Sequence, residues 1–209
     1  MLRLYSIPVS LYSAKLRIVL RHKGLAFEEI PPPGGYGSEE YKRTVPSGNI
    51  PAMVDGELML ADSEAIAEYL EERHPAPSML PGDAAARARL RERSRFHDTR
   101  LEPELRALFP HMPPRECPEA VAKRQGERLN ARLAQLAVML GPEAGTTLTL
   151  GDAGLPITFA WMDAFDGPLP LGLQWPEAVT AYRARLAAHP AVRDELDAYA
   201  PAVADYVGR

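Results

Sequence analysis

Strand-like patterns are confined to the first third of this chain, and this uneven distribution constrains the fold more than any other feature. Apolar and polar residues alternate over Leu2–Tyr5, which is the period of a half-buried strand. Helical spacing of apolar residues follows over Ser10–Lys23, and Gly24 then provides a helix stop signal. Ala26–Ile30 predicts a second strand. The chain therefore opens with a strand–helix–strand unit.

A hairpin and a helix complete this first part. Two apolar runs, Ile50–Val54 and Leu58–Leu60, flank an Asp-Gly pair, which is a strong hairpin signal. Asp62 and Ser63 then offer a cap to a helix predicted over Glu64–Arg73. The order β-α-β-loop-β-β-α within about 75 residues is the arrangement of a thioredoxin-like α/β domain.

Only helical patterns occur after the break at His74–Pro77. We therefore expect a thioredoxin-like domain over residues 1–76, a linker over 77–86 and an all-helical C-terminal domain over 87–209. The predicted helices of the last part are Ala84–Leu108, Pro118–Leu140, Leu155–Phe165, Pro176–Ala188 and Pro190–Tyr199.

Charge and composition exclude several kinds of partner and site. The formal net charge is −4, without the basic face that binds nucleic acid. The N-terminus lacks the pattern of a signal peptide, and no apolar run reaches the roughly 20 residues that span a membrane, so we expect a cytoplasmic protein without membrane contact. Cys117 is the only cysteine and the five histidines lack ligand spacing, so we expect no internal disulfide and no metal.

The first candidate for chemistry is Ser10-Leu11-Tyr12-Ser13, which follows a strand and begins a helix. A thioredoxin-like fold carries its Cys-x-x-Cys motif at this place, and here both cysteine positions are serine. A serine cannot exchange disulfides, but its hydroxyl can donate a hydrogen bond to a bound thiolate and lower the pKa of that thiol. A purely structural interpretation is that Ser10 only caps the helix.

Two further features lie in the same domain. A cis bond between Ile50 and Pro51 would expose backbone groups of Ile50 to an extended peptide, whereas a trans proline would be an ordinary strand start. The helix start at Asp62-Ser63 suits a ligand carboxylate, with Asp62 free to pair with an ammonium group, or it is a plain cap. Together with Ser10, these features meet the requirements for holding γ-glutamyl-cysteinyl-glycine.

At this point the sequence resembles the cytosolic glutathione transferase family, in a bacterial-type form with a serine-type active site. The resemblance is strong over residues 2–75 and architectural beyond them. The stretches that carry it are Ser10–Leu20, Lys23–Leu25, Val45–Met53 and Asp62–Leu70. It implies a homodimer that uses glutathione as a co-substrate, with an electrophile pocket against the helical domain.

The resemblance also implies roles for the residues that bind glutathione. The Ile50-Pro51 turn, with a cis bond, would hold the cysteinyl part through the backbone of Ile50. Asp62 and Ser63 would hold the γ-glutamyl part, and Asn49 lies where a side chain often contacts the glycyl end. The sequence departs from the family pattern because Asp62 replaces a longer Glu or Gln, and Val45-Pro46 replaces Asn-Pro.

The residue that contacts the thiolate is left open among three candidates. Ser10 aligns with the serine of serine-type classes and also with the cysteine of omega-like classes, so it is our first choice. Tyr12 is the second candidate and Ser13 the third.

The electrophile pocket is predicted from the first long helix of the second part. Phe96 and Arg100 fall four residues apart on one helix face, and His97 lies beside them. Tyr36, in a glycine-rich loop, is expected to cover the site as a lid. Further candidates near the end of that helix are Phe109, His111 and Met112.

These features predict a glutathione S-transferase that activates the glutathione thiolate for attack on a small hydrophobic electrophile, a detoxification reaction. One alternative is a glutathione-dependent isomerase or lyase, including ether or halide cleavage, at the same site. Another is a non-catalytic member of the fold that serves in binding or interaction. A thiol–disulfide oxidoreductase is disfavoured, because Cys117 lies outside the first domain.

Overall fold

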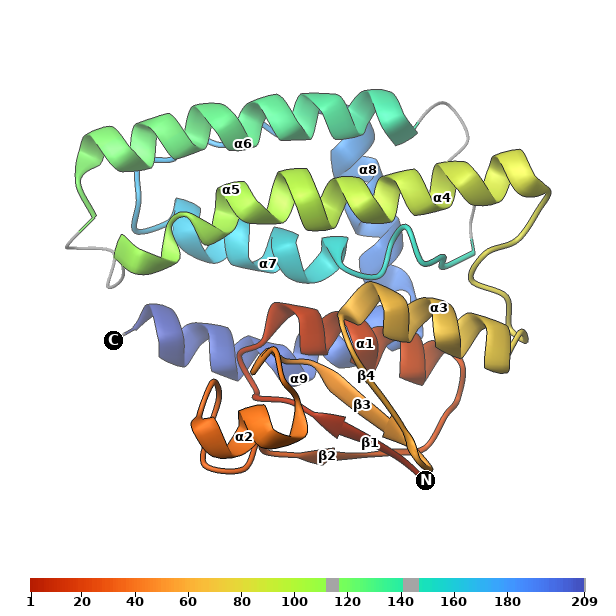
Figure 1. The fold of residues 1–209 in the computed structure, drawn as a ribbon. Coiled ribbons are helices and arrows are strands. Elements are labelled where there is room, and N and C mark those ends of the chain that lie inside the picture. The colour runs from red at the N-terminus through yellow and green to blue at the C-terminus, as the bar shows by residue number, and fades with distance from the viewer. Residues whose placement is uncertain (112–116, 141–146, 209) are drawn as a thin grey trace.

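The computed structural model describes residues 1–111, 117–140 and 147–208, and its first part is built on a four-stranded mixed sheet. The strands lie in the order β2-β1-β3-β4, with β1 and β2 parallel and the other pairs antiparallel (Figure 1). This confirms the predicted thioredoxin-like order. The strands are β1 (Leu2–Tyr5), β2 (Phe27–Ile30), β3 (Ala52–Asp55) and β4 (Leu58–Ala61).

Alternation along the strands gives the sheet two apolar faces. Leu4 and Met53 point into the main core, where helices α1 (Leu11–His22) and α3 (Ser63–Arg73) pack against them. Neighbouring strand residues point the other way and pack against the short helix α2 (Glu39–Thr44). Figure 1 shows α1 and α3 between the sheet and the rest of the molecule. The N-terminus of α1 therefore begins where the sheet meets the helical domain.

Helices are the only regular elements among the described residues of the second part, as predicted. Its elements are α4 (Ala84–Phe96), η1 (His97–Leu101), α5 (Glu102–Arg106), η2 (Phe109–His111), α6 (Glu119–Leu140), α7 (Leu155–Asp166), α8 (Glu177–Ala188) and α9 (Pro190–Val207). None of the helices in the described ranges is long and apolar enough to cross a membrane. The last helix, α9, continues to Val207, past the predicted end at Tyr199. Pro201 lies inside this helix and does not end it.

The long helical stretch predicted over Ala84–Leu108 is present over residues 84–106, but it is not one regular α-helix. The α-helical path ends at Phe96, and a π-helical turn, η1, follows before α5 begins at Glu102. A π turn contains one more residue than an α turn, so it rotates every later side chain relative to the earlier ones. This shift decides which residues of the helix face the first domain.

Buried ion pairs join α1 to both parts of the molecule. Lys15 Nζ lies 2.7 Å from Glu64 of α3 and 2.9 Å from Asp98 of η1, and the Lys15 side chain is almost wholly buried. Arg17 Nε lies 2.7 Å from Glu195 of α9. Buried charges without partners are costly, so these pairs hold α1 in one position against the helical domain.

Candidate active site

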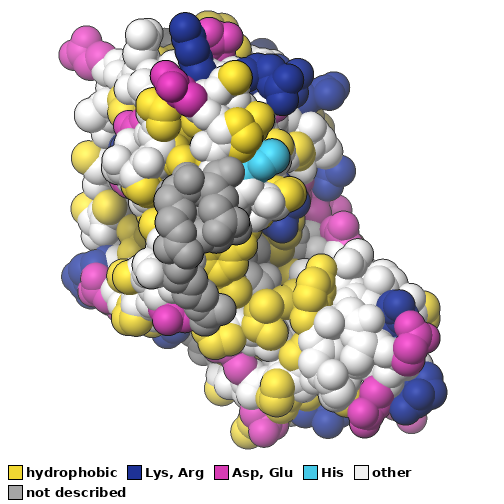
Figure 2. All heavy atoms as spheres, turned by 90° about the vertical axis from the view of Figure 1, so that its left-hand side faces the viewer, with side chains coloured by type: hydrophobic (Ala, Val, Ile, Leu, Met, Phe, Trp, Pro, Cys, Tyr) yellow, Lys and Arg dark blue, Asp and Glu magenta, His cyan; other side chains and the backbone are white. Residues whose placement is uncertain are grey.

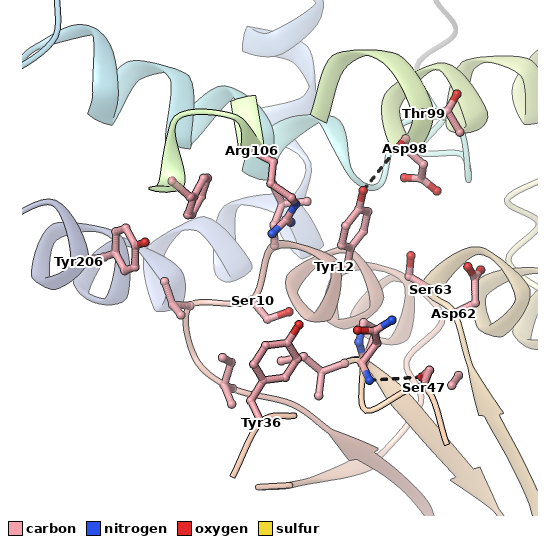
Figure 3. Close-up of a pocket in the computed structure, with 18 of the residues that line it drawn as sticks. Ser10, Tyr12, Tyr36, Ser47, Asp62, Ser63, Asp98, Thr99, Arg106 and Tyr206 are labelled. Atoms are coloured by element: carbon pink, nitrogen blue, oxygen red, sulfur yellow. Dashed lines mark hydrogen bonds between the residues drawn. The ribbon is translucent and has the colours of Figure 1, made fainter. Parts of the chain in front are cut away.

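A cavity of about 720 Å³ lies between the sheet domain and the helical domain. Figure 2 shows hydrophobic side chains gathered along the hollow between the two parts on this face. The close-up in Figure 3 shows polar side chains converging on the cavity from both domains. Its lining residues are Ile7, Val9, Ser10, Leu11, Tyr12, Tyr36, Ser47, Asn49, Ile50, Pro51, Ala61, Asp62, Ser63, Arg95, Asp98, Thr99, Arg106, Phe109 and Tyr206.

Ser10 caps the N-terminus of α1 and points into the cavity (Figure 3). Its Oγ accepts the backbone N–H of Ser13 at 3.2 Å and the hydroxyl of Ser13 at 3.0 Å. A serine hydroxyl has two acceptor lone pairs and one proton to donate. Both acceptor positions of Ser10 are used, so its own proton remains for a group in the cavity. The positive end of α1 favours an anion at the same place.

Tyr12 lines the same cavity, but its hydroxyl is already engaged. It donates to Glu102 Oε2 at 3.0 Å, and Arg106 lies over the Tyr12 ring at 5.6 Å from the centroid. Burial, followed by the nearby carboxylates of Glu102 and Asp98, raises the pKa of Tyr12 well above its usual value. The phenol therefore stays protonated and is committed to α5, which makes it a poor partner for a thiolate.

Ser13, the third sequence candidate, does not line the cavity. Its side chain is fully buried one turn into α1, and its hydroxyl contacts Ser10 instead. Of the three candidates for thiolate contact, the structure thus places only Ser10 with a free donor facing the cavity. That distinction depends on hydrogen-bond partners, which the sequence does not reveal.

The turn Asn49-Ile50-Pro51 forms the floor of the cavity, and the predicted cis bond before Pro51 is confirmed. The turn is fixed from below by Tyr41, whose buried hydroxyl donates to the Asn49 carbonyl at 3.0 Å. The Asn49 backbone N–H donates to Ser47 Oγ at 3.2 Å (Figure 3). Asn49 and Ile50, predicted to contact the glycyl and cysteinyl parts of a ligand, therefore lie together beside Pro51.

Asp62 and Ser63 lie at the start of α3, beside this turn. Asp62 has a φ of 118°, a conformation that residues with a side chain rarely adopt. Its Oδ1 accepts the N–H groups of Glu64 and Ala65 at 2.9 and 3.0 Å. Within the described part of the chain, Oδ2 of Asp62 and the hydroxyl of Ser63 have no hydrogen-bond partner. The helix start thus presents one acceptor and one hydroxyl to the cavity.

The helical wall of the cavity carries a carboxylate that the sequence reasoning missed. Asp98 of η1 lines the cavity and is bonded to Lys15 at 2.9 Å and to His97 Nδ1 at 2.7 Å. Burial acts to raise the pKa of Asp98, but the hydrogen bond from His97 and the charge of Lys15 outweigh it and lower the pKa to about 2. Asp98 is therefore ionised at neutral pH.

The predicted electrophile residues Phe96, His97 and Arg100 do not line the cavity, so this prediction is wrong. Phe96 is buried in the core, and His97 is 1% exposed with its Nε2 bonded to Thr158 Oγ1 at 2.7 Å. Arg100 is exposed to solvent away from the cavity. The physical reason is that Phe96 and His97 lie on the side of the helix that packs into the core, where His97 is held by Thr158. The residues of this stretch that line the cavity are Arg95, Asp98 and Thr99.

Two aromatic side chains line the cavity on the side of the helical domain. Phe109 lines it as predicted, together with Tyr206 of α9, and the two rings lie 5.5 Å apart. Arg106 lies 5.6 Å from the ring centroids of both Tyr12 and Phe109 and is paired with Glu102. His111 is described but does not line the cavity, and Met112 lies outside the described residues.

Tyr36 closes the cavity on the side of the first domain. It is 58% exposed and lies in the loop between β2 and α2, where Gly35 and Gly37 adopt positive φ. Its ring points into the cavity, with the hydroxyl directed toward Ser10 (Figure 3).

Among the described residues, no three His, Cys, Asp or Glu side chains are grouped closely enough to hold a metal ion.

Comparison with known sequences finds relatives that match part or most of the chain. A family model described as "Glutathione S-transferase, N-terminal domain" matches residues 4–78. Glutathione S-transferase Z2 of Arabidopsis thaliana is 40% identical over 90 residues, which is 42% of this chain and less than half, 40%, of that relative. A stringent starvation protein A homolog of Haemophilus ducreyi is 29% identical over 193 residues, covering 88% of this chain and 84% of that protein.

Comparison with solved structures extends the likeness to both domains. The structure of a maleyl pyruvate isomerase, described as a bacterial glutathione S-transferase of the zeta class, aligns with a TM-score of 0.75 at 27% identity. The alignment covers 92% of this chain and 95% of that one. The helical wall of the cavity therefore belongs to the shared architecture, as the sheet domain does.

Proposed function

Because the chain belongs to the glutathione transferase superfamily, we propose that it binds glutathione and activates the thiol for attack on a small hydrophobic electrophile. The observation that carries this proposal is the state of Ser10. Its two acceptor positions are filled by Ser13, and its proton is free at the N-terminus of α1, on the wall of the cavity. A donor in that position stabilises a thiolate more than a thiol.

The remaining cavity residues suit the rest of glutathione. The free Oδ2 of Asp62 would accept the α-ammonium of the γ-glutamyl group, and the hydroxyl and first-turn N–H of Ser63 would bind its carboxylate. The backbone of Ile50 would pair with the cysteinyl residue, and Asn49 would contact the glycyl end. Such a placement puts the cysteine sulfur next to Ser10.

The chemistry then needs little more than binding and thiol activation. The thiol proton leaves to solvent and the thiolate forms a bond to an electrophilic carbon. The leaving group departs with its electron pair, or, with an activated alkene, the adjacent carbon takes a proton. The rings of Phe109 and Tyr206 on the helical side of the cavity favour a hydrophobic electrophile. We also propose that the protein is cytoplasmic and that it forms a homodimer. Light scattering on the purified chain would test the dimer.

A glutathione-dependent isomerase is the second candidate, and one observation favours it. A solved structure that aligns over most of this chain is named maleyl pyruvate isomerase. In such a reaction the thiolate would add to a conjugated double bond, the new single bond would rotate, and elimination would return glutathione unchanged. The same Ser10 and the same cavity would serve both reactions.

Calorimetric titration with glutathione tests the shared part of both candidates. We expect binding at millimolar glutathione or below, weakened about tenfold in Ser63→Ala, which loses one charge-assisted hydrogen bond. Thr180→Ala, on the exposed face of α8, is the control and should bind as the wild type does. No binding at millimolar glutathione would refute both enzymatic functions.

Turnover then separates the candidates. Loss of free thiol in the presence of 1-chloro-2,4-dinitrobenzene indicates transfer. Conversion of a maleyl compound to its fumaryl isomer, with free thiol conserved, indicates isomerisation. Glutathione binding with neither reaction would instead favour a binding role, which the likeness to a stringent starvation protein A homolog also leaves as a candidate.

A further inference from the structure

Ser13 is a buried hydroxyl for which helix formation alone gives no reason. It lies on α1 one turn after Ser10, its side chain is 0% exposed, and it does not line the cavity. The cap of α1 needs only the backbone N–H of Ser13, which donates to Ser10 Oγ at 3.2 Å. The Ser13 hydroxyl makes a second, separate hydrogen bond to the same Oγ at 3.0 Å. Among the described residues, this is its one hydrogen-bond partner.

The two bonds from Ser13 fix what Ser10 can do. The backbone N–H can only donate, so it permanently occupies one lone pair of Ser10. The Ser13 hydroxyl can occupy the other. We propose that Ser13 is a positioning residue that holds Ser10 as a hydrogen-bond donor, so that a chain runs from the Ser13 hydroxyl through the Ser10 hydroxyl to the thiolate in the cavity. This inference rests on the proposed function.

The physical basis is cooperativity between linked hydroxyls. An oxygen that accepts a hydrogen bond is polarised and becomes a stronger donor, by roughly 10–30% per bond in condensed-phase estimates. In the structure the Ser13 hydroxyl donates to Ser10 along their 3.0 Å contact. A thiolate is an anion and a better acceptor than a neutral hydroxyl, so it draws the Ser10 proton toward the cavity. Ser13, sealed from water, then has only Ser10 to donate to.

Ser13→Ala isolates this contribution, because it removes the hydroxyl and keeps the backbone N–H that caps α1. The readout is the ultraviolet absorbance of the glutathione thiolate bound to the protein, followed against pH. We expect the pKa of the bound thiol to rise by about half a unit, a fraction of the effect of losing Ser10 itself. Affinity for S-methylglutathione, which has no thiol proton, should stay within twofold of the wild type.

Two further variants test whether the hydroxyl itself is responsible. Ser13→Thr keeps the hydroxyl and should restore the wild-type pKa. Ser13→Cys has nearly the same shape with a weak donor and should give a value between wild type and Ser13→Ala. Melting curves for each variant establish that the fold is retained. If the Ser13→Thr protein does not fold, the order of the bound-thiol pKa values in the wild type, Ser13→Cys and Ser13→Ala still tests the inference.

A double-mutant cycle decides whether Ser13 acts through Ser10. In the Ser10→Ala background, Ser13→Ala should cause no further change in the pKa of the bound thiol. An equal rise with and without Ser10, or no rise in the wild-type background, would overturn the inference while leaving the proposed function intact. A wild-type protein that binds glutathione without lowering its thiol pKa would instead refute the proposed function, and a protein that binds no glutathione would refute both.

Discussion

Replacing Ser10 by alanine removes the donor on which the proposed function depends. Hydrogen bonds to charged groups contribute about 1.5–3 kcal/mol, and 1.36 kcal/mol corresponds to one pKa unit. Loss of the bond to the thiolate should therefore raise the pKa of bound glutathione by roughly 1–2 units. Ser10 lies at a half-buried wall of the cavity, so the lower end of this range, about one unit, is expected.

The catalytic consequence follows from the amount of thiolate. At a pH below the thiol pKa, a rise of about one unit leaves about one tenth of the reactive form. We expect kcat/KM with 1-chloro-2,4-dinitrobenzene to fall about tenfold near neutral pH. The difference should shrink as pH rises past the new pKa. A constant ratio across the pH range would contradict an effect on thiol ionisation.

Ser10→Ala also removes the cap of α1, since Ser10 Oγ accepts the N–H of Ser13. Loss of a cap costs about 1 kcal/mol of stability, so the effects on the fold and on the thiol must be separated. Asp83→Ala is a matched control, because Asp83 Oδ1 caps α4 by accepting the N–H of Ala86 at 2.9 Å, outside the cavity. It should lower stability similarly and leave the thiol pKa unchanged. Ser10→Gly should raise the thiol pKa but leave stability nearly unchanged, because glycine is a tolerable cap.

The assay is a pH titration of the thiolate absorbance in protein saturated with glutathione. Calorimetry at each pH checks that the ligand stays bound. If Ser10→Ala binds glutathione with an unchanged thiol pKa, then Ser10 is not the partner of the thiolate and the reasoning from its filled acceptor positions fails.

Three other variants probe the surrounding residues. Tyr12→Phe should leave the thiol pKa unchanged, because the hydroxyl donates to Glu102, and should lower the free energy of unfolding by about 1 kcal/mol in urea. Asp98 has a pKa of about 2 against a usual 3.8, so its ionised form stabilises the fold above about pH 4 by about 2 kcal/mol, and this is lost as pH falls toward 2. In Asp98→Asn, unfolding monitored by fluorescence should show a flatter pH dependence in that window, and an unchanged slope would contradict the assignment. Tyr36→Ala should change stability by less than about 0.5 kcal/mol but raise the KM for the electrophile, because this exposed ring covers the cavity.

The first domain and its half of the site could be predicted from the sequence because their signals are local. Alternation over β1, the helical spacing of α1 and the Asp-Gly turn between β3 and β4 each identify an element without reference to the others. The order of these elements then brings Ser10, Pro51 and Ser63 to one end of the sheet. All three line the cavity in the structure.

The helical wall could not be predicted in the same way. Apolar spacing over 84–108 indicates a helix, but it does not reveal the π turn at His97–Leu101. Phe96, the last residue before that turn, enters the core, whereas Asp98 within the turn reaches the cavity. Tyr206 depends on how far α9 continues beyond Pro201, which its sequence pattern does not show. These residues are placed by tertiary packing rather than by local preference.

The same packing explains why the site requires both domains even though Ser10 belongs to the first. Ser10 caps helix α1, and four of the helix's side chains are bonded to the helical part: Tyr12 to Glu102, Lys15 to Asp98, and both Arg17 and Arg21 to Glu195. Separating the domains would leave the buried Lys15 and Arg17 charges without some of their partners, which is strongly unfavourable. The direction of the Ser10 hydroxyl is therefore set by a helix that the second domain holds in place. A truncated first domain, even if it folds, should not present Ser10 to a thiol in the same way.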